Sequence, residues 1–352
     1  MSMVSNSKPE SELTATLDLN PRVVRVVAGV IRDREDNILI AKRPLHVHQG
    51  GKWEFPGGKI EVGESREQAL VRELAEELGI QSTRFSPLIQ IRHNYSDKSV
   101  LLDVWEVTEF EGLASGKEGQ EIKWVAPAEL NTYQFPAANK PIIKAAILPS
   151  CYFITPDSVG ISAAEMALNI EKAIAQDLKL VQLRLKTPDA AYLNDVLSRV
   201  HQTVMAQDVK LLLNSDCIDL MSDCEADSFK CVSGVHLTSR ALMACTERPN
   251  YSLVSASCHS QSELSKAQSL GLDFVTLSPI KQTLSHPDAE QILGLETFCL
   301  WVELATVPIY ALGGMSLSDI ECVRELGGQG VAGIRGILEK EDQAFGKRTK
   351  TC

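Results

Sequence analysis

The sequence predicts two domains: an α+β domain in the first half of the chain and a (β/α)8 TIM barrel in the second. The first observation is length, because 352 residues exceed what one ordinary hydrophobic core encloses. The second is a group of short apolar runs around one acidic helix pattern in the first half. The third is a series of eight apolar runs after residue 150, which alternate with helix-like stretches as in a parallel barrel.

The domain boundary is predicted at Leu148-Pro149-Ser150, whose proline favours a linker over a helix or a strand. Residues before position 22 are polar and show no regular apolar pattern. We therefore expect a disordered N-terminal segment at 1–21, the α+β domain at 22–147, the linker at 148–150, the barrel at 151–338 and a C-terminal tail at 339–352.

One helix of the first domain is marked at both ends. Ser65 followed three residues later by Gln68 is a capping box, and Gly79 suits a left-handed C-terminal stop. The pattern therefore predicts a helix from about Ser65 to Leu78. Short strands are expected around it at Val23–Ile31, Ile38–Lys42 and Val100–Val107.

The two faces of this helix differ in chemistry. Leucines recur at helical spacing on one face, whereas Glu73, Glu76 and Glu77 occupy a separate arc of about 100°. A bound cation would relieve the repulsion between these carboxylates, and hard oxygen ligands select Mg²⁺ or Mn²⁺. The alternative is an acidic face that is simply solvated.

The second half carries the strand-like runs of the barrel. Helix-like stretches such as Ser262–Leu270 and Ser316–Leu326 separate some of them. The eight expected strands are Cys151–Thr155, Leu180–Lys186, Lys210–Asn214, Gly234–Leu237, Leu253–Cys258, Phe274–Pro279, Pro308–Gly314 and Gly330–Ile337.

Composition excludes several classes of protein. A net charge of −11 argues against direct nucleic-acid binding, which needs clustered lysine and arginine. The N-terminal residues lack a signal-peptide pattern, and no apolar run approaches membrane-spanning length. Nine scattered cysteines without a C-x-x-C pair argue against a disulfide framework and fit a reducing cytosol. We therefore expect a cytoplasmic protein with small-molecule partners.

A family resemblance rests on the helix and its surroundings. The run from Gly58 to Ile80 places Glu64, Arg72, Glu73, Glu76, Glu77 and Gly79 at the offsets of a Nudix box. Further matching runs are Lys42-Arg43, His48, Trp53-Glu54-Phe55-Pro56-Gly57-Gly58, Gly116-Lys117-Glu118-Gly119-Gln120, and Phe135-Pro136 with Asn139 and Pro141. On these residues, Val23 to about Ile143 resembles the bacterial 8-oxo-dGTP diphosphatases of the Nudix family.

The resemblance implies a metal site and a reaction. It implies that divalent metals, Mg²⁺ with Mn²⁺ as the alternative, are held by the Gly57 carbonyl, Glu76, Glu77 and Glu118. It implies that Glu73 acts as general base or as a further ligand and that Arg72 orients it. Water would attack a phosphorus of 8-oxo-dGTP and release 8-oxo-dGMP and pyrophosphate. Such an activity sanitises the nucleotide pool, avoids replication errors and supports DNA repair.

The same resemblance implies a nucleotide-binding set, consisting of Arg43, His48, Glu54, Phe55, Pro56, Gly57 and Asn139. The carboxamide of Asn139 can accept from the protonated N7 of 8-oxoguanine while it donates to O6, whereas guanine presents acceptors at both positions. The alternatives are that Arg43 is a surface charge, that His48 is a loop residue, and that Asn139 caps a turn before Pro141.

The second domain resembles thiamine phosphate synthase and the related thiazole tautomerase from Cys151 to about Leu338. Matching runs include Val181-Gln182-Leu183-Arg184-Leu185-Lys186, Gly234-Val235-His236-Leu237 and Ala311-Leu312-Gly313-Gly314-Met315. The resemblance implies a site for a thiamine-type phosphate at the carboxyl ends of the strands. Its candidate residues are Gln182, Arg184, Lys186, Asn214, Ser257, His259, Thr283, Ser285, Gly314 and Gly333.

Departures from the synthase pattern remove charge. Asn214-Ser215 stands where the synthase has Asn-Asp, and Thr238-Ser239-Arg240 stands where its second magnesium carboxylate is expected. The lysine of its Thr-x-Thr-Lys motif is replaced by His286. A Mg²⁺-pyrophosphate leaving group would be poorly stabilised here, so we do not expect synthase activity. His259 lies where the tautomerase has its proton-transfer histidine, although a structural histidine is the alternative.

Three hypotheses follow from the sequence. In the first, the Nudix domain hydrolyses 8-oxo-dGTP and the barrel binds a thiamine-type phosphate. In the second, the chain is a thiamine-related diphosphatase or a bifunctional hydrolase and tautomerase. In the third, the barrel is a non-catalytic metabolite sensor that modulates the hydrolase.

Overall fold

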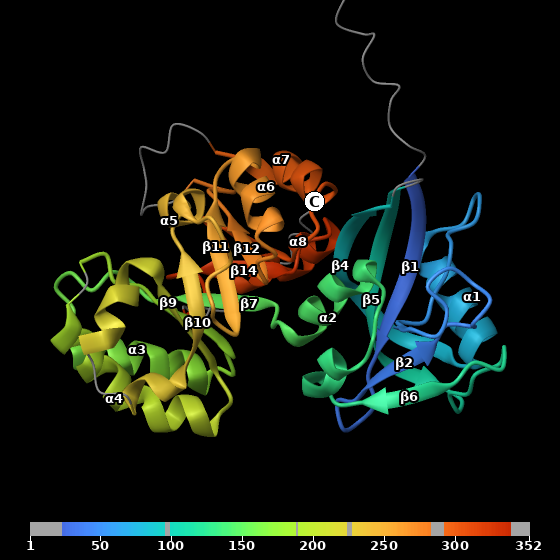
Figure 1. Cartoon of the computed structure of the whole chain (residues 1–352), viewed down its shortest axis with the longest axis horizontal. Coiled ribbons are helices and arrows are strands. Elements are labelled where there is room, and N and C mark those ends of the chain that lie inside the picture. The colour runs from blue at the N-terminus through green and yellow to red at the C-terminus, as the bar shows by residue number, and fades with distance from the viewer. Residues whose placement is uncertain (1–22, 96–98, 188, 224–226, 283–291, 339–352) are drawn as a thin grey trace, which may run out of the picture.

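The chain forms two domains in a computed structural model (Figure 1). The structure describes residues 23–95, 99–187, 189–223, 227–282 and 292–338. The predicted N-terminal segment and C-terminal tail, together with Thr283 and Ser285, lie outside these residues. None of the helices in these ranges is both long and apolar enough to cross a membrane.

The N-terminal domain contains two three-stranded sheets. In the first sheet, β5 (Ser99–Glu111) pairs in parallel with β1 (Val23–Ile31) and antiparallel with β4 (Gln81–Asn94). In the second, β2 (Ile38–Lys42) lies between β3 (Trp53–Glu54) and β6 (Ile122–Val125). The sequence predicted β1 and β2 with the observed bounds, and it predicted a shorter β5.

Strand β4 was not predicted from the sequence. Its pattern is broken by Arg84 and Pro87, and its pairing with β5 shifts register at both places. Proline is tolerated there because β4 forms an edge of the sheet. A residue of an edge strand whose N–H would point away from the sheet has no partner strand on that side. Bulges of this kind destroy the two-residue periodicity from which a strand is recognised.

Helix α1 (Arg66–Leu78) begins and ends as predicted. Ser65 and Gln68 form both hydrogen bonds of the capping box, and Gly79 ends the helix at φ 68°. The apolar face, which contains Leu70 and Leu74, is fully buried. Burial of this face fixes the rotation of the helix, so its acidic arc points away from the core. A second helix, α2 (Lys140–Ile147), follows η2 (Pro127–Thr132) and η3 (Ala137–Asn139).

The C-terminal domain is a closed barrel of eight parallel strands, which confirms the predicted fold class. Its strands are β7 (Cys151–Ile154), β8 (Leu180–Leu183), β9 (Lys210–Asn214), β10 (Val232–Leu237), β11 (Leu253–Cys258), β12 (Phe274–Leu277), β13 (Ile309–Leu312) and β14 (Gly330–Gly333). Around them lie α3 (Ala163–Ala175), α4 (Ala190–Ala206), η4 (Ser215–Asp223), η5 (Ser228–Cys231), α5 (Ser239–Ala244), α6 (Gln261–Ser269), α7 (Gly294–Val302), η6 (Leu317–Asp319) and α8 (Ile320–Glu325).

Aromatic residues fill one level of the barrel interior. Tyr152, Phe274 and Tyr310 are fully buried, and the ring of Phe274 lies 5.2 Å from each tyrosine ring, edge to face. Six cysteines of the described residues are free thiols, and Cys322 is disulfide-bonded.

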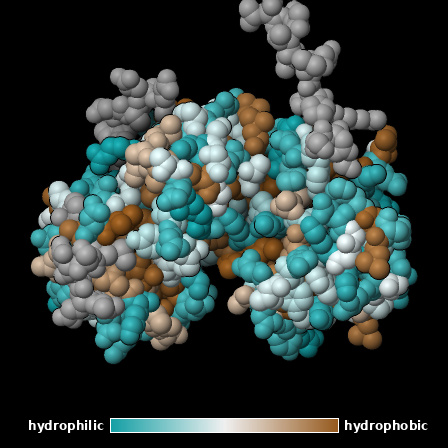
Figure 2. All heavy atoms as spheres, in the orientation of Figure 1, coloured by the Kyte–Doolittle hydropathy of each residue, from teal (hydrophilic) through white to brown (hydrophobic). Residues whose placement is uncertain are grey.

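The first domain contacts the barrel at the amino ends of its strands. Gln329, which precedes β14, donates to the carbonyls of Ala145 and Leu148 at 3.0 and 2.9 Å. Lys144 pairs with Asp273, which directly precedes β12, at 2.9 Å. Figure 2 shows the two domains as separate lobes with a notch between them. The carboxyl ends of the barrel strands therefore lie on the side away from these contacts.

Candidate active site

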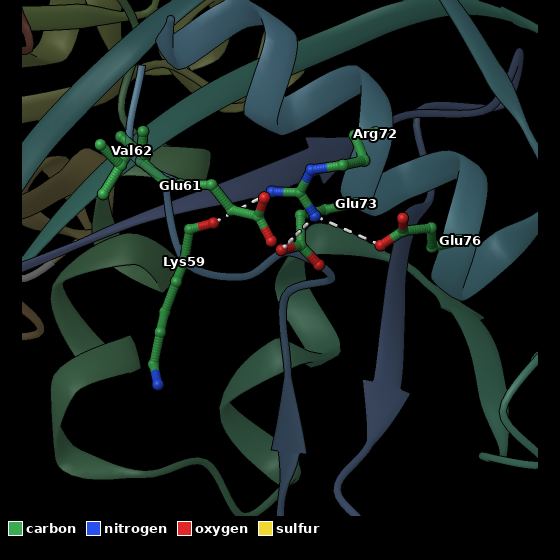
Figure 3. Close-up of a pocket in the computed structure, with 7 residues that line it drawn as sticks. Lys59, Glu61, Val62, Arg72, Glu73 and Glu76 are labelled. Carbon is green, nitrogen blue, oxygen red and sulfur yellow. Dashed lines mark hydrogen bonds and ion pairs between the residues drawn. The ribbon is translucent and has the colours of Figure 1, made fainter. Parts of the chain in front are cut away.

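Arg72 organises the acidic face of α1. Its guanidinium contacts Glu64 at 2.8 and 2.9 Å, Glu73 at 2.9 Å and Glu76 at 3.2 Å. It also donates to the Lys59 carbonyl at 3.1 Å. The hydrogen bonds to Glu64 and Glu73 raise the pKa of Arg72, and the hydrogen bond from Arg72 lowers the pKa of Glu64. Figure 3 shows Arg72 between the helix and the preceding loop, with its guanidinium pointing toward Glu73 and Glu76.

An open hollow of about 770 Å³ lies beside this cluster. Its lining residues come from α1 and from the loop that precedes it, and they are Lys59, Ile60, Glu61, Val62, Arg72, Glu73 and Glu76. A hollow of this size with charged walls is suited to a polar ligand.

Glu77 is partly buried against the loop before α1. Its side chain accepts from the backbone N–H of Gly57 at 3.0 Å. Burial raises the pKa of Glu77 to about 8, and the nearby charges of Glu54, Glu73 and Glu118 add to that rise. Four carboxylates therefore act on one another around Glu77, although they come from different segments.

The loop that carries Glu118 is fastened to the end of α1. The backbone N–H of Lys117 and the side-chain amide of Gln120 both donate to the Glu77 carbonyl, at 2.9 and 3.0 Å. Carbonyls in the last turn of a helix have no partner within the helix, so they are free to accept these bonds. This attachment brings Glu118 within electrostatic reach of Glu77.

Two glycines allow the loop before α1 to approach closely. Gly57 has φ 145°, and a Cβ atom there would lie 2.2 Å from the Val27 carbonyl oxygen. A Cβ atom on Gly58 would lie 2.3 Å from the carboxyl carbon of Glu73. Gly57 is therefore required by its contact with β1, whereas a side chain at position 58 would displace the Glu73 carboxylate.

The carboxylates fit a hard divalent cation in chemistry, but they do not form an assembled cage. In the described ranges, no three side chains of the His, Cys, Asp and Glu types converge as metal ligands. Glu73 and Glu76 instead contact Arg72. Burial is the main cause of the raised pKa of Glu77, and the repulsion by neighbouring carboxylates that adds to this rise is what a cation would relieve.

Three of the residues predicted to bind the nucleotide, Arg43, His48 and Glu54, are in contact. Arg43 forms an ion pair with Glu54, and its Nε donates to the His48 carbonyl at 3.1 Å. The His48 ring lies 5.7 Å from the ring of Tyr95, and Phe55 stacks on Phe135 at 5.5 Å.

Asn139 lies at the junction of η3 and α2. It occupies the N-cap position of α2, but its side chain makes no capping hydrogen bond, so the capping alternative is not what the structure shows. The buried residues Phe135 and Pro136 precede it, and the residue is partly exposed. The carboxamide is therefore not used to cap the start of α2.

Some of the barrel candidates make structural contacts, and others lie at the open mouth of the barrel. The carboxamide of Asn214 accepts from the Leu185 N–H and donates to the Leu185 carbonyl, both at 3.0 Å. The hydroxyl of Ser257 lies 2.9 Å from Nε2 of His236, and burial lowers the pKa of that histidine to about 3. His259 is exposed, and its Nδ1 lies 2.8 Å from the Ser278 carbonyl oxygen.

The remaining barrel candidates surround the same end. Gln182 is buried, Arg184 is partly buried, and Lys186 is exposed and pairs with Asp157 at 3.3 Å. Gly314 has φ 64°, and a Cβ atom on Gly333 would lie 2.8 Å from the Ile337 side chain.

Hydroxyl groups meet between the two segments, Asn214-Ser215 and Thr238-Ser239-Arg240, in which the synthase pattern has its carboxylates. The backbone N–H of Thr238 donates to the Ser215 hydroxyl at 3.1 Å, and the two hydroxyl oxygens lie 3.4 Å apart. A neutral contact thus joins the ends of β9 and β10.

Sequence reasoning missed three features of these sites. Glu64 was recognised as part of the motif, but its pairing with Arg72 was not foreseen. Tyr95, which contacts His48, belongs to the unpredicted strand region, so only a correct placement of β4 could have found it. Lys281 is a cation near the predicted phosphate cradle, and it pairs with Asp319 at 2.7 Å. A search for charged residues after each predicted strand could have found it.

The fold and the acidic helix define a phosphohydrolase domain that is joined to a (β/α)8 barrel domain. The chain belongs to the Nudix family through its first domain and to the thiamine monophosphate synthase family through its second. Residues 27–145 match the family profile described as NUDIX domain, and residues 151–337 match that described as Thiamine monophosphate synthase.

Individual relatives match each domain separately. The 8-oxo-dGTP diphosphatase of Escherichia coli (strain K12) is 42% identical over 34% of this chain and 93% of its own length. The CTP pyrophosphohydrolase of the same organism is 40% identical over 35% of this chain and 91% of its own length. The thiamine-phosphate synthase of Desulfitobacterium hafniense (strain Y51) is 27% identical over 55% of this chain and 91% of its own length. The first domain is thus a Nudix hydrolase related to 8-oxo-dGTP diphosphatases, and the second is thiamine phosphate synthase-like.

The raised pKa of Glu77 predicts a pH-dependent stability of the metal-free protein. The folded chain keeps this proton up to about pH 8, whereas the unfolded chain releases it near 4.5. The contribution is therefore complete below the unfolded value and is lost as pH rises through the folded value. In EDTA, Tm should fall between pH 5 and pH 8.5, and Mg²⁺ should restore it. Glu77→Gln should have a flatter profile in EDTA, and equal slopes would contradict this assignment.

Proposed function

We propose that the first domain is a Mg²⁺-dependent 8-oxo-dGTP diphosphatase, with Mn²⁺ as the alternative metal. The observation that carries this proposal is that the Asn139 carboxamide does not cap its helix, which leaves its acceptor and donor for a ligand. Relatives named for 8-oxo-dGTP support the choice of substrate. Its role would be to remove a damaged nucleotide before replication.

We assign the metal to Glu76, Glu77, Glu118 and the Gly57 carbonyl, with Glu73 as a further ligand or as the general base. A divalent cation in this position supplies positive charge that neutralises phosphate oxygens and makes water more acidic. Glu73 would accept the proton of the attacking water, and Arg72 would hold the Glu73 carboxylate in position. Burial of Glu77 excludes water from one side of the site and strengthens its interaction with charge.

Arg43, His48 and Glu54 would form the polar edge of the nucleotide site, and Phe55, Pro56 and Gly57 would form its wall. The Arg43–Glu54 pair fixes both side chains before the nucleotide binds. Burial raises the pKa of Glu54, and the Arg43 guanidinium opposes that rise. Asn139 would read the base, because its acceptor and donor match the N7–H and O6 of 8-oxoguanine.

Replacement of Asn139 tests the substrate assignment. Asn139→Ala should lower kcat/KM for 8-oxo-dGTP by roughly tenfold to a hundredfold and should change the value for dGTP much less. The reason is that only the oxidised base loses a matched donor and acceptor. Steady-state kinetics on 8-oxo-dGTP, dGTP, CTP and thiamine diphosphate would measure this.

Asn131→Ala serves as a control, because Asn131 is exposed in η2 of the same domain. Equal losses on 8-oxo-dGTP and dGTP would make Asn139 structural. A preference of the unaltered protein for CTP would replace the proposed substrate.

The second candidate function is a thiamine-related diphosphatase. It is favoured by the presence of a thiamine phosphate synthase-like barrel on the same chain. In that case the barrel would bind a pyrimidine or thiazole phosphate, and the Nudix site would cleave the corresponding diphosphate. The same kinetic screen separates the two candidates, since thiamine diphosphate would then exceed 8-oxo-dGTP in kcat/KM.

For the barrel itself, we propose a binding module for a thiamine-type phosphate. Gln182, Arg184 and Lys186 would supply polar contacts, and backbone N–H groups near Gly314 and Gly333 would hold the phosphate. Ser257 and His259 face the same mouth and are the candidates if a proton-transfer activity exists. Asn214 would act indirectly, because its carboxamide is bonded to the Leu185 backbone.

A further inference from the structure

The free edge of β4 is closed by backbone groups of the barrel. The N–H of Gln90 donates to the Gly327 carbonyl, and the N–H of Arg92 donates to the Ala305 carbonyl, both at 3.0 Å. Gly327 has φ 86°, and a Cβ atom there would lie 2.8 Å from the Gln90 Cβ atom. The turn between α8 and β14 is therefore shaped to approach β4 closely.

Gln90 also links this turn to the acidic helix. Its side-chain amide donates to the buried carboxylate of Asp103 at 3.1 Å, and Arg66 contacts the same carboxylate oxygen at 3.3 Å. Arg66 is the first residue of α1, and its second guanidinium nitrogen pairs with Glu325 at 2.9 Å. Glu325 is the last residue of α8, so the barrel touches the start of the helix that carries the Nudix carboxylates.

An arginine at the start of a helix is unfavourable by itself. The helix dipole places partial positive charge at this end, where acidic residues are preferred. Arg66 is held there by Asp103 and Glu325 and by the face of Trp105, whose ring centre lies 5.3 Å from the guanidinium carbon. The start of α1 is thus fixed by contacts with β5 and with the other domain.

We propose that Glu325 of the barrel is a positioning residue for the Nudix reaction, acting through Arg66 on the orientation of α1. This proposal rests on the diphosphatase function, although not on a particular nucleotide. Glu73 and Glu77 lie about two to three turns beyond Arg66, so a small tilt at the first turn moves both carboxylates. A displacement of about 1 Å at a reacting group can lower a rate about a hundredfold.

The test uses a charge reversal and a matched control in the full-length chain. Glu325→Lys places a second cation against Arg66, whereas Glu321→Lys makes the same change one turn earlier on α8, at an exposed residue. Glu325→Lys should lower kcat by roughly threefold to thirtyfold with little change in KM, and Tm should shift only slightly. Glu321→Lys should keep the wild-type kcat. Glu325→Gln keeps an acceptor oxygen at the same reach and should recover most of the activity.

The measurement is made with whichever nucleoside triphosphate the wild-type protein hydrolyses. The test of Glu325 therefore stays valid if 8-oxo-dGTP is not the substrate. The affinity for Mn²⁺, followed by electron paramagnetic resonance without substrate, gives a second readout and should fall in Glu325→Lys alone. If Glu325→Lys does not fold, Glu325→Ala is used instead, and it should likewise lower kcat and the affinity for Mn²⁺. Wild-type kcat and Mn²⁺ affinity in a folded Glu325 variant, or equal losses in the Glu321→Lys control, would overturn the proposal.

Discussion

Glu77→Gln should abolish diphosphatase activity while the fold is retained. The substitution removes a metal-binding charge but keeps an oxygen that can accept from the Gly57 N–H, so the loop before α1 should stay in place. This carboxylate is partly buried, so solvent cannot readily replace its charge once it is removed. Purified variants would be compared by steady-state hydrolysis in Mg²⁺ and by circular dichroism.

The control is Glu129→Gln, an exposed carboxylate in η2 that lies outside the proposed site. It should keep full activity. If Glu77→Gln retained more than about a tenth of kcat, the loss would be under about 1.4 kcal/mol, which is too small for a metal ligand.

Thiamine phosphate synthesis by the barrel should be undetectable. Ser215 and Thr238 form a neutral contact where two carboxylates would hold a magnesium ion, and the motif lysine is replaced by His286. Expulsion of pyrophosphate without these charges loses several kcal/mol of transition-state stabilisation, on the order of a thousandfold or more in rate. Product formation from a pyrimidine diphosphate and a thiazole phosphate would be assayed beside an active synthase as positive control.

Binding should survive this loss, since one phosphate needs only backbone donors and a cation or two. Calorimetry with thiamine phosphate on the full chain should therefore detect an interaction that weakens in Lys186→Ala. Thiamine phosphate formed above the uncatalysed background, and lost in Lys186→Ala, would make the chain bifunctional instead. No detectable binding would exclude the sensor hypothesis.

Local signals explain how much of the fold was predictable. Ser65, Gln68 and Gly79 each determine a backbone conformation on their own, so α1 was predicted to within one residue. The barrel strands are mostly buried on both faces, and their largely apolar runs are visible in the sequence. Strand β4 escaped prediction because Pro87 and two irregular pairings hide its alternation, and its partners are distant in sequence.

The sequence proposes the members of the candidate site, but it does not give their arrangement. Helical spacing placed the three glutamates of α1 on one face, yet it gave no sign that Arg72 would contact Glu64, Glu73 and Glu76 together. The ion pair of Arg66 with Glu325 joins residues 259 positions apart, and no local pattern encodes such a contact. The environment of Glu77 likewise depends on loops that only the folded chain brings together.

The attachment of the Nudix domain at the amino ends of the barrel strands determines how material can pass between the two sites. The barrel mouth opens at the carboxyl ends, so a metabolite that leaves it enters bulk solvent. The fusion therefore supplies the two sites in equal numbers, and the described residues form no conduit between them. A scavenging enzyme added in excess should intercept any compound that one domain releases for the other.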